Sequence, residues 1–383
     1  MRILIAPSGY KECLEADRVA DAIAAGVARA MPEAEIDRFP LVDGGEGFAR
    51  TMATASGGRV HEINVTGPTG QAVEALLGEM GGGGPLTFLV EMAQAAGLRL
   101  VPPDARDPTR TTTRGVGELI RAALDRGAER IIVGCGDSGT NDGGAGMAAA
   151  LGCRLLDGGG GAIGPGSAGL ATLARIDLGT RDPRLAAVTI EAALNITTRL
   201  CGPRGVARLF GPQKGADEAT IVKMEAALEN YAAIVRRDVG VEVANMPGGG
   251  ASGGLGAGLA ALLGATLRSR YDIIFATFDL DARLASADLV LTAEGGIDLQ
   301  TPQGKIPVEV ARRAKLRGLP VLALAGQVGE PARIVYEHGI DAFFSTTAGP
   351  CTMEAAMRDA ESTLALSAEN VMRAVLAGRR LSR

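Results

Sequence analysis

The residue types best suited to catalysis lie in a glycine-rich loop, the segment VGCGDSGTNDGGAG at Val133–Gly146. The loop follows an expected strand and begins an expected helix, and it carries Asn141 and Asp142 side by side. Backbone N–H groups at the start of a helix bind phosphate, and a neighbouring carboxylate suits Mg²⁺. We therefore predict that the loop serves phosphate or metal chemistry. On this view Asp142→Asn slows turnover ~10²-fold or more without changing the melting temperature.

The same loop also fits a nicotinamide cofactor. Its spacing Gly134-x-Gly136-x-x-Gly139 matches the dinucleotide-binding fingerprint, and Asp157 follows about 20 residues later at the end of a strand-like run. A single match of this kind has low specificity, and acidic and amide residues inside the loop are unusual for the fingerprint. An NAD-dependent oxidoreductase is the main alternative, and a purely structural strand-to-helix turn is a further one.

The chain has no G-x-x-x-x-G-K-[ST] segment, which excludes a P-loop kinase. Phosphoryl transfer without a P-loop still needs cations for the phosphates, carboxylates for magnesium and an oriented hydroxyl group. Other glycine-flanked loops at predicted strand ends offer such groups, although a single carboxylate there is more often a helix cap or a solvated turn. They supply Asp43, Gly44, Gly45 and Glu46 in DGGEG, Lys214 in GPQKGA, and Glu294, Asp298, Gln300 and Lys305 in EGGIDLQTPQGK.

Three further segments each have a functional and a structural interpretation. RTTTRGVGELI could cradle an anion with Thr112 and Thr113, or form a helix start that Thr113 caps. Lys11 follows the first strand and is either a partner for phosphate or carboxylate or a surface lysine. The glycine-rich stretch Gly248–Gly258 either lets the backbone approach a ligand closely or lines a helix-packing surface.

The elements that must position these loops follow an α/β pattern. Short apolar runs alternate with segments of helical periodicity at both ends of the 383-residue chain, and again from residue 86. Such alternation predicts parallel sheets with crossover helices. We expect two domains, a discontinuous Rossmann-like parallel-sheet domain of residues 1–85 and 286–383, and an inserted α/β domain of residues 86–285.

Charge and composition argue against several other classes of protein. The net charge is −5 without a long basic run, so we expect no nucleic-acid partner. The chain contains no run of apolar residues long enough to span a bilayer, so we expect no membrane partner. The five cysteines form no C-x-x-C pair and no secretory leader precedes the first strand, which predicts reduced thiols and a cytoplasmic location. The two histidines lie far from the glycine loops, which argues against histidine-centred chemistry.

Eight segments occur along the chain in a characteristic order. They are IAPSGYKECL, VDGGEG, EMAQAAGL, TTTRGVGELI, TNDGGAGM, CGPRGVARLFGPQKGA, GGLGAGL and EGGIDLQTPQGK. With these segments the chain resembles the type I glycerate kinases from end to end. The resemblance implies ATP and Mg²⁺ as cofactors and phosphorylation of glycerate, commonly to 2-phosphoglycerate. It also implies a discontinuous Rossmann-like domain with a second α/β domain inserted.

The resemblance, taken together with the candidates named above, assigns a role to each of several residues. The expected magnesium ligands are Asp43, Glu46 and Glu294. The expected catalytic residues are Asp142, Asp298 and Lys11, of which Asp298 or Asp142 would orient or deprotonate the substrate hydroxyl. The expected contacts to substrate and phosphate are Asn141, Lys214, Lys305, Gln300, Thr112, Thr113, Gly44 and Gly45.

Four positions depart from the family's usual motifs. Ser8, Asn195 and Thr197 stand where acidic residues are usual. Gly296 stands where an arginine is usual. An arginine can bind a carboxylate through two hydrogen bonds, so its absence predicts an altered preference for the acid. The alternative is that another arginine restores the contact.

The sequence as a whole predicts an ATP-dependent kinase that phosphorylates glycerate or a related small hydroxy acid. Its partners would be that acid and a nucleotide, and a homodimer is a candidate assembly. An NAD-dependent oxidoreductase is the first alternative. A non-catalytic sensor on a degenerate kinase scaffold is the second, because several charged motif residues are missing.

Overall fold

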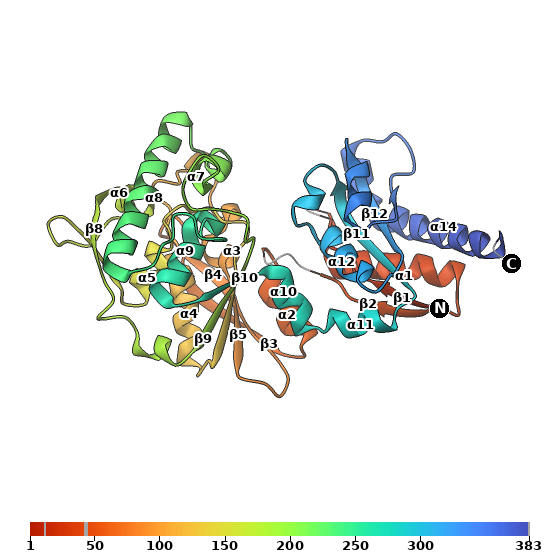
Figure 1. Cartoon of the computed structure of the whole chain (residues 1–383), viewed down its shortest axis with the longest axis horizontal. Coiled ribbons are helices and arrows are strands. Elements are labelled where there is room, and N and C mark those ends of the chain that lie inside the picture. Colours follow the sequence, from red (N-terminus) through yellow and green to blue (C-terminus); the bar gives the residue numbers. More distant parts are fainter. Residues whose placement is uncertain (11–12, 42–44, 382–383) are drawn as a thin grey trace. The chain divides into compact units, whose positions relative to one another are not determined.

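A computed structural model describes residues 1–10, 13–41 and 45–381 of the chain. Proximity between Cα atoms divides the chain into two compact units. Unit 1 combines Met1–Asp43 with Ile274–Arg383, and unit 2 is Gly44–Ile273. The two ends of the chain, red and blue in Figure 1, therefore belong to the same unit.

Unit 1 contains a five-stranded, all-parallel sheet with the strand order β13-β12-β11-β1-β2. The strands are β1 (Arg2–Ile5), β2 (Glu35–Arg38), β11 (Leu289–Ile297), β12 (Val321–Val328) and β13 (Ala342–Ser345). The chain proceeds from β1 to β2 on one side and from β11 to β12 on the other, so the order reverses between β1 and β11. The C-terminal ends of strands at such a reversal are the usual ligand site of open α/β sheets.

Two helices, α1 (Ala16–Ala30) and α14 (Ala360–Leu381), pack together over one face of this sheet. Val19, Ile23 and Val27 recur at helical spacing, and all three side chains are buried. Gly26 permits the close approach, since a Cβ there would lie 2.1 Å from the carbonyl oxygen of Ala365. The other helices of the C-terminal part are α10 (Arg270–Thr277), α11 (Leu280–Ser286), α12 (Ile306–Lys315) and α13 (Met353–Arg358).

Unit 2 contains a six-stranded sheet with the order β10-β9-β6-β5-β4-β3. The strands are β3 (Arg59–Thr66), β4 (Ala72–Glu79), β5 (Thr87–Glu91), β6 (Arg130–Gly134), β9 (Thr189–Leu194) and β10 (Thr266–Ser269), and β7 (Arg154–Asp157) pairs separately with β8 (Leu173–Asp177). The helices are α2 (Phe48–Ala55), α3 (Met92–Ala96), α4 (Arg114–Asp125), α5 (Ala145–Ala150), α6 (Gly166–Thr172), α7 (Val206–Phe210), α8 (Glu218–Val239) and α9 (Ala251–Leu263). Strands β5, β6, β9 and β10 are parallel, so the predicted α/β class is confirmed in both units.

The division between the units differs from the predicted domain boundaries. Strands β3 and β4 form the predicted hairpin, and β4 pairs antiparallel with β5, for example Leu77 with Val90. Residues 59–79, which the sequence placed with the terminal domain, therefore belong to the sheet of unit 2. The glycine run Gly81–Gly84 joins β4 to β5, which pair with each other in the sheet of unit 2. That the units fold as independent domains stays a prediction.

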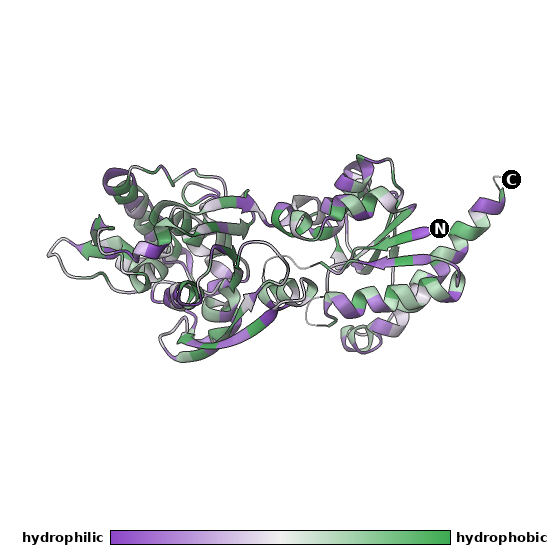
Figure 2. Ribbon diagram, turned by 90° about the horizontal axis from the view of Figure 1, so that it is seen from below, coloured by the Kyte–Doolittle hydropathy of each residue, from purple (hydrophilic) through white to green (hydrophobic). Residues whose placement is uncertain are grey.

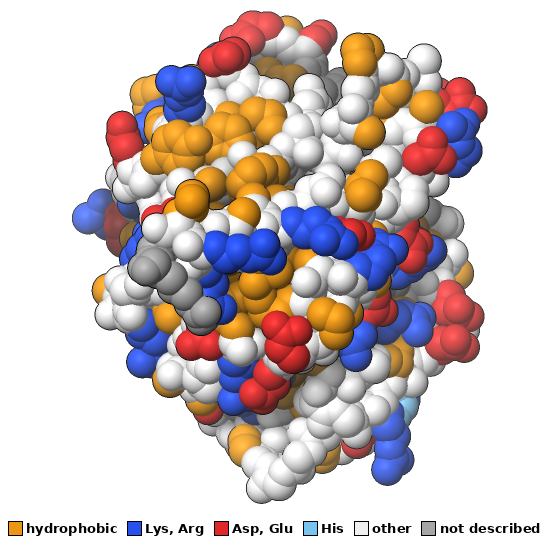
Figure 3. Space-filling view, turned by 90° about the vertical axis from the view of Figure 1, so that its right-hand side faces the viewer, with side chains coloured by type: hydrophobic (Ala, Val, Ile, Leu, Met, Phe, Trp, Pro, Cys, Tyr) orange, Lys and Arg blue, Asp and Glu red, His pale blue; other side chains and the backbone are white. Residues whose placement is uncertain are grey.

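Side-chain polarity follows the layers of both units. In Figure 2 the long helices show one hydrophobic and one hydrophilic side, as expected for helices that cover a sheet. On the face shown in Figure 3, Lys and Arg side chains are interspersed with Asp and Glu. Exposed ion pairs of unit 1 include Arg373–Glu369 (2.8 Å) and Arg358–Asp359 (2.9 Å).

Candidate functional site

The carboxylate of Asp142 is the centre of a hydrogen-bond network in unit 2. Asp142 is 1% exposed, and it accepts hydrogen bonds from the backbone N–H groups of Thr113 (2.8 Å), Gly144 (3.1 Å) and Gly146 (3.2 Å). The hydroxyl of Thr113 also donates to this carboxylate, at 2.8 Å from Oδ2. Burial raises the pKa of Asp142, and these donors oppose that rise. The carboxylate thus joins the starts of α4 and α5.

Thr112 and Thr113, which the sequence placed in an anion cradle, have partners within the fold: Thr113 bonds to Asp142, and the hydroxyl of Thr112 accepts the N–H of Arg114 (3.2 Å). Thr113 precedes α4, but its hydroxyl accepts the N–H of Met147 (3.0 Å) besides donating to Asp142, and it does not cap α4. The N–H of Thr112 donates to the carbonyl of Pro68 (2.9 Å). The geometry favours a positioning role for all three predicted site residues of this network. Their direct contact with substrate stays a prediction.

Lys214 lies beside the same network, in a short 3-10 turn of residues Pro212–Lys214. Its side chain is 2% exposed, and its Nζ donates to Ser138 Oγ (2.9 Å) and to the carbonyl of Thr140 (2.7 Å). Burial lowers the pKa of Lys214 to about 7, against the opposing effect of the Asp142 charge. The ammonium group is therefore held by neutral oxygens, and it titrates near neutral pH.

Asn141 stands out because its side chain has no partner in the described part of the chain. The residue is 1% exposed, and neither its Oδ1 nor its Nδ2 makes a hydrogen bond. Thr140 Oγ1 and Ser252 Oγ are buried and unpartnered as well. Each such group costs about 1–3 kcal/mol of stability, and native proteins keep only a few.

The first residues of α9 pack against the turn at Thr140–Gly143 in an unusual backbone conformation. Ser252, Gly253 and Gly254 all have positive φ, at 53°, 70° and 90°. A Cβ on Gly253 would lie 2.0 Å from the carbonyl oxygen of Thr140, so only glycine fits there. The carbonyl of Gly253 accepts the N–H of Gly143 (3.0 Å). The predicted helix-packing role of this glycine-rich stretch is thus realised, directly against the Thr140–Gly143 turn.

In unit 1, polar side chains gather after β11, beside the point where the strand order reverses. Lys305 Nζ lies 3.3 Å from Glu294 Oε1 and 3.6 Å from Asp298 Oδ1, and it donates to the carbonyl of Gly296 (3.1 Å). Asp298 Oδ1 also accepts the N–H of Gln300 (2.8 Å). The structure therefore brings together four of the predicted site residues, with an ammonium group between two carboxylates.

The four departures from the family motifs have separate local environments. The hydroxyl of Ser8 donates to a carbonyl of β11 (3.0 Å). Asn195 Oδ1 accepts both the N–H (3.0 Å) and the hydroxyl (2.8 Å) of Thr197, which forms a local turn after β9. The space beside Gly296 is open, since a Cβ there would have one neighbour within 4 Å, the carbonyl oxygen of Gln327 at 3.9 Å.

The loop before α2 is described only from Gly45 onward. Glu46 is exposed; its carboxylate pairs with Arg99 (3.2 Å), and its N–H donates to Asp137 (3.2 Å). Gly45 is buried. The predicted site residues Lys11, Asp43 and Gly44 lie outside the described residues.

Sequence reasoning missed Glu91, which ends β5 and is 1% exposed. Its carboxylate accepts the N–H groups of Gly47 and Ala49, both at 3.1 Å, and the side-chain amide of Gln94 (3.2 Å). Burial raises the pKa of Glu91 against these donors. Glu91 therefore fixes the start of α2 and the loop that carries Glu46. An acidic residue that ends an apolar strand, as in TFLVE, is the signal that could have identified it.

The expected magnesium ligands Glu46 and Glu294 belong to different units, and Asp43 lies outside the described residues. Among the described residues, no group of three or more His, Cys, Asp or Glu side chains could hold a metal ion. Glu46 belongs to unit 2 and Glu294 to unit 1. Two carboxylates do converge in unit 1, those of Glu294 and Asp298 on Lys305.

The dinucleotide fingerprint is not realised around the Gly134–Gly139 loop. In that fingerprint the acidic residue ends a strand beside the first one, in position to bind a ribose. Here Asp157 ends β7, which pairs antiparallel with β8 in a sheet separate from β6. The Asp157 carboxylate accepts the N–H groups of Gly159 and Gly161, both at 2.9 Å, within its own turn. The nicotinamide alternative is therefore wrong on structural grounds.

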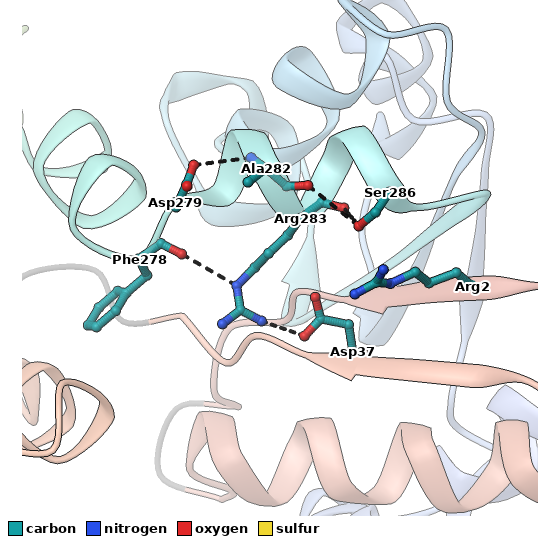
Figure 4. Close-up of a pocket in the computed structure, with 7 residues that line it drawn as sticks. All are labelled: Arg2, Asp37, Phe278, Asp279, Ala282, Arg283 and Ser286. Atoms are coloured by element: carbon teal, nitrogen blue, oxygen red, sulfur yellow. Dashed lines mark hydrogen bonds and ion pairs between the residues drawn. The ribbon is translucent and has the colours of Figure 1, made fainter.

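A hollow of about 400 Å³ on unit 1 carries none of the predicted site residues (Figure 4). It is lined by Arg2, Asp37, Phe278, Asp279, Ala282, Arg283 and Ser286. Arg283 pairs with Asp37, donates to the carbonyl of Phe278 (3.4 Å) and stacks on the ring of Phe39. The two arginines are balanced by two aspartates, so we assign this hollow no role in anion binding.

An α/β fold with lysines and carboxylates on glycine-rich loops at strand ends suits a phosphotransferase without a P-loop. Comparison with known proteins agrees. Residues 3–376 match the model of the glycerate kinase family. The chain is 44% identical to a glycerate 2-kinase of Escherichia coli K12 over 380 residues, which are 99% of each chain. It is also 44% identical to a glycerate kinase of Bacillus subtilis 168 over 371 residues, which are 97% of each.

A crystal structure from Salmonella typhimurium LT2, provisionally assigned as glycerate kinase 2, is similar over 100% of both chains, with a TM-score of 0.85 and 46% identity. The chain belongs to the glycerate kinase family. It is thus a kinase, a phosphotransferase with an alcohol group as acceptor. The comparisons support neither the oxidoreductase nor the non-catalytic sensor.

Proposed function

We propose that the protein transfers the γ-phosphoryl group of ATP to a hydroxyl group of glycerate and releases 2-phosphoglycerate and ADP. The chain is 44% identical to a glycerate 2-kinase and to a glycerate kinase over nearly the whole length of each. This end-to-end similarity carries the proposal. The name of the Escherichia coli relative, glycerate 2-kinase, favours the 2-hydroxyl group as acceptor. A related small hydroxy acid is the alternative substrate, because Gly296 leaves space where the family usually has an arginine.

The cluster after β11 supports a phosphate-handling role. Lys305 can neutralise charge on a transferred phosphoryl group, and Glu294 and Asp298 offer the oxygen ligands that Mg²⁺ prefers. Magnesium usually takes one or two protein carboxylates and completes its shell with phosphate and water, so this pair fits a metal that arrives with the nucleotide. When bound, the metal would neutralise phosphate charge.

The reaction breaks the bond between the γ-phosphorus of ATP and the oxygen that bridges it to the β-phosphorus, which leaves with ADP. A new bond joins the γ-phosphorus to the hydroxyl oxygen of glycerate. The hydroxyl proton must leave, and a carboxylate can accept it. Asp298 suits this role better than Asp142, because it is 42% exposed whereas the carboxylate of Asp142 is occupied by backbone donors. Asp298 is the proposed base, and Lys11 stays a predicted phosphate contact outside the described residues.

Several expectations about the cellular context also stay predictions. None of the described helices is long and apolar enough to cross a membrane. All five cysteines are free, as expected for reduced thiols. The cytoplasmic location and the homodimer are not tested by these observations.

A coupled assay of ADP release tests the proposed function. Purified protein is supplied with Mg-ATP and, separately, with glycerate and a panel of larger hydroxy acids. We expect that ADP is released when glycerate is present, and that chelating the magnesium with EDTA abolishes this release. Adding enolase, which dehydrates 2-phosphoglycerate but not its 3-phospho isomer, identifies the product. Absence of acid-dependent ADP release across the panel would refute the proposal.

A further inference from the structure

Four buried polar atoms without a hydrogen-bond partner gather at one turn of unit 2 and the residue packed against it. Asn141 contributes an amide oxygen and an amide nitrogen, and Thr140 contributes a hydroxyl. Ser252 contributes a second hydroxyl, and the adjoining Gly253 contacts Thr140 and Asn141 through its backbone. Unsatisfied groups of this kind reduce stability, so a structure that retains several at one place calls for a functional explanation.

A cation lies beside these groups. Lys214 Nζ is 2.7 Å from the carbonyl oxygen of Thr140, the residue before Asn141. Ser252 is half-buried as a residue, although its hydroxyl oxygen is itself buried. Its φ of 53° is strained for a residue other than glycine, and such strain concentrates at ligand sites. An ammonium, an amide and a hydroxyl thus belong to this turn or to residues that adjoin it: Lys214 bonds to Thr140, Asn141 is part of the turn, and Ser252 precedes Gly253.

The combination of free donors and free acceptors selects the class of ligand. The amide nitrogen of Asn141 needs an acceptor, which either a carboxylate or a phosphate supplies. Its amide oxygen needs a donor, and phosphates of ATP near neutral pH offer only acceptors. An acid with a hydroxyl group next to its carboxylate satisfies both atoms. A small hydroxy acid therefore fits the group better than a nucleotide phosphate does.

We propose that Asn141, Ser252 and Lys214 bind the carboxylate and the adjacent hydroxyl group of the acid that accepts the phosphoryl group. This assignment rests on the proposed function, because it names the part of unit 2 that recognises the acceptor. Asp142 and Thr113 act as positioning residues that hold the turn in place. Two other occupants are possible outcomes of the test, an ordered structural water and a nucleotide phosphate.

The decisive variant is Asn141→Leu, which keeps the size of the side chain and removes both unpartnered atoms. We expect the KM for glycerate to rise about 10- to 100-fold, as for lost hydrogen bonds to a charged ligand, while the KM for ATP is unchanged. The melting temperature without ligand should be unchanged or higher, because a buried unsatisfied amide is replaced by an apolar group. Glycerate without nucleotide should raise the melting temperature of the wild type but not of the variant.

A second variant, Ser252→Gly, covers the case in which the first one fails to fold. Glycine relieves the positive φ and removes the hydroxyl group, so the melting temperature should rise while the KM for glycerate increases about two- to tenfold. Tyr231→Phe is the matched control. It removes another buried unpartnered hydroxyl, on a ring that packs beside Gly143 of the same turn, and the KM for both substrates should be unchanged if the acid binds through Asn141 and Ser252.

The outcomes separate this inference from the proposed function. A wild-type protein that does not phosphorylate glycerate would refute the proposed function itself. An active wild type together with an unchanged KM for glycerate in Asn141→Leu would overturn the acid site. A lower melting temperature with an unchanged KM would show a water-bridged structural role. A raised KM for ATP alone would show a nucleotide site, and either result would overturn the inference.

Discussion

The two polar clusters of this protein use the same residue types in opposite ways. In unit 2 the carboxylate of Asp142 is buried and bound by backbone N–H groups, and the ammonium of Lys214 is held by neutral oxygens. In unit 1 the ammonium of Lys305 is partly exposed and lies between two carboxylates. The charges of the first cluster are buried beside the turn at Asn141, whereas those of the second are partly exposed and pair with one another.

This difference teaches that a motif carboxylate need not be a catalytic one. A carboxylate that accepts several backbone donors stabilises loops, and its free lone pairs are few. A carboxylate that shares a cation with another can exchange that cation for a ligand. We therefore assign phosphate chemistry to the Lys305 cluster and acid recognition to the turn at Asn141.

The largest expected effect sharpens the assignment of the Lys305 cluster. Lys305→Met removes the ammonium between Glu294 and Asp298 and should lower kcat/KM by ~10²–10³-fold, the usual loss on removal of one group that stabilises developing charge. The side chain is 26% exposed, so the melting temperature should change little. Steady-state kinetics and thermal denaturation measure both. Wild-type kcat/KM in this variant would remove the cluster from the reaction.

Replacing Asp298 and Asp142 each with asparagine tests whether the two clusters differ in the way described. Asp298→Asn should lower kcat ~10²-fold with little loss of stability, as expected for a base near solvent. Asp142→Asn should instead destabilise the fold by about 2–4 kcal/mol, because an amide nitrogen would face backbone donors in a buried site.

This expectation for Asp142 replaces the one drawn from the sequence, which was an unchanged melting temperature. Chemical denaturation of both variants gives the free energies of unfolding, and single-turnover rates give the chemical step. If Asp142→Asn unfolds like the wild type and reacts slowly, the carboxylate acts directly on substrate.

A smaller effect is expected from pH. The ammonium of Lys214 loses its proton near pH 7, so the KM for the acid should rise with pH, up to about tenfold per unit well above the pKa. Asp142 is the charged group that opposes this loss of the proton. In the unfolded chain Lys214 keeps its proton up to about pH 10.5, so between about pH 7 and this value the unfolded state binds more protons than the folded state. The fold therefore becomes more stable as pH rises through this range.

Measuring the KM for glycerate and for ATP from about pH 6 to about pH 9 checks the pH prediction. The KM for ATP should show no such rise above pH 7. A KM for glycerate that is flat across this range would remove Lys214 from acid binding.

The smallest expected effect concerns the open space beside Gly296. Gly296→Arg restores the family's usual residue, and the nearest atom to its Cβ would be 3.9 Å away, so the fold should accept it. A guanidinium here can bind a carboxylate, and we expect kcat/KM for glycerate to rise about tenfold while that for bulkier hydroxy acids falls. An unchanged ratio between the acids would show that another arginine already supplies the contact.

Sequence periodicity predicted most of the strands and helices correctly. The strand Thr189–Leu194 and the hairpin around Gly67–Gly70 were found because alternating runs and turn residues act locally. The division into two units differs from the predicted boundary near residue 85, because the pairing of β4 with β5 depends on contacts that a glycine run does not reveal.

The candidate site was predictable in its residues but not in their roles. Motif spacing identified Asp142 and Asp298, and only the fold shows that Asp142 accepts the N–H groups of Thr113, Gly144 and Gly146 whereas Asp298 lies beside the ammonium of Lys305. Glu91 escaped notice because its partners are backbone N–H groups 42 and 44 residues earlier in the chain. Such bonds leave no trace in local composition.

Calorimetric titration of two variants with each substrate alone tests the central claim most directly. Glycerate and Mg-ATP are titrated separately into wild-type protein, Asn141→Leu and Lys305→Met. The account predicts that Asn141→Leu loses affinity for glycerate and keeps it for Mg-ATP, and that Lys305→Met shows the reverse. Loss of the same ligand by both variants, or of neither ligand by either, would contradict the assignment of the two clusters to different tasks.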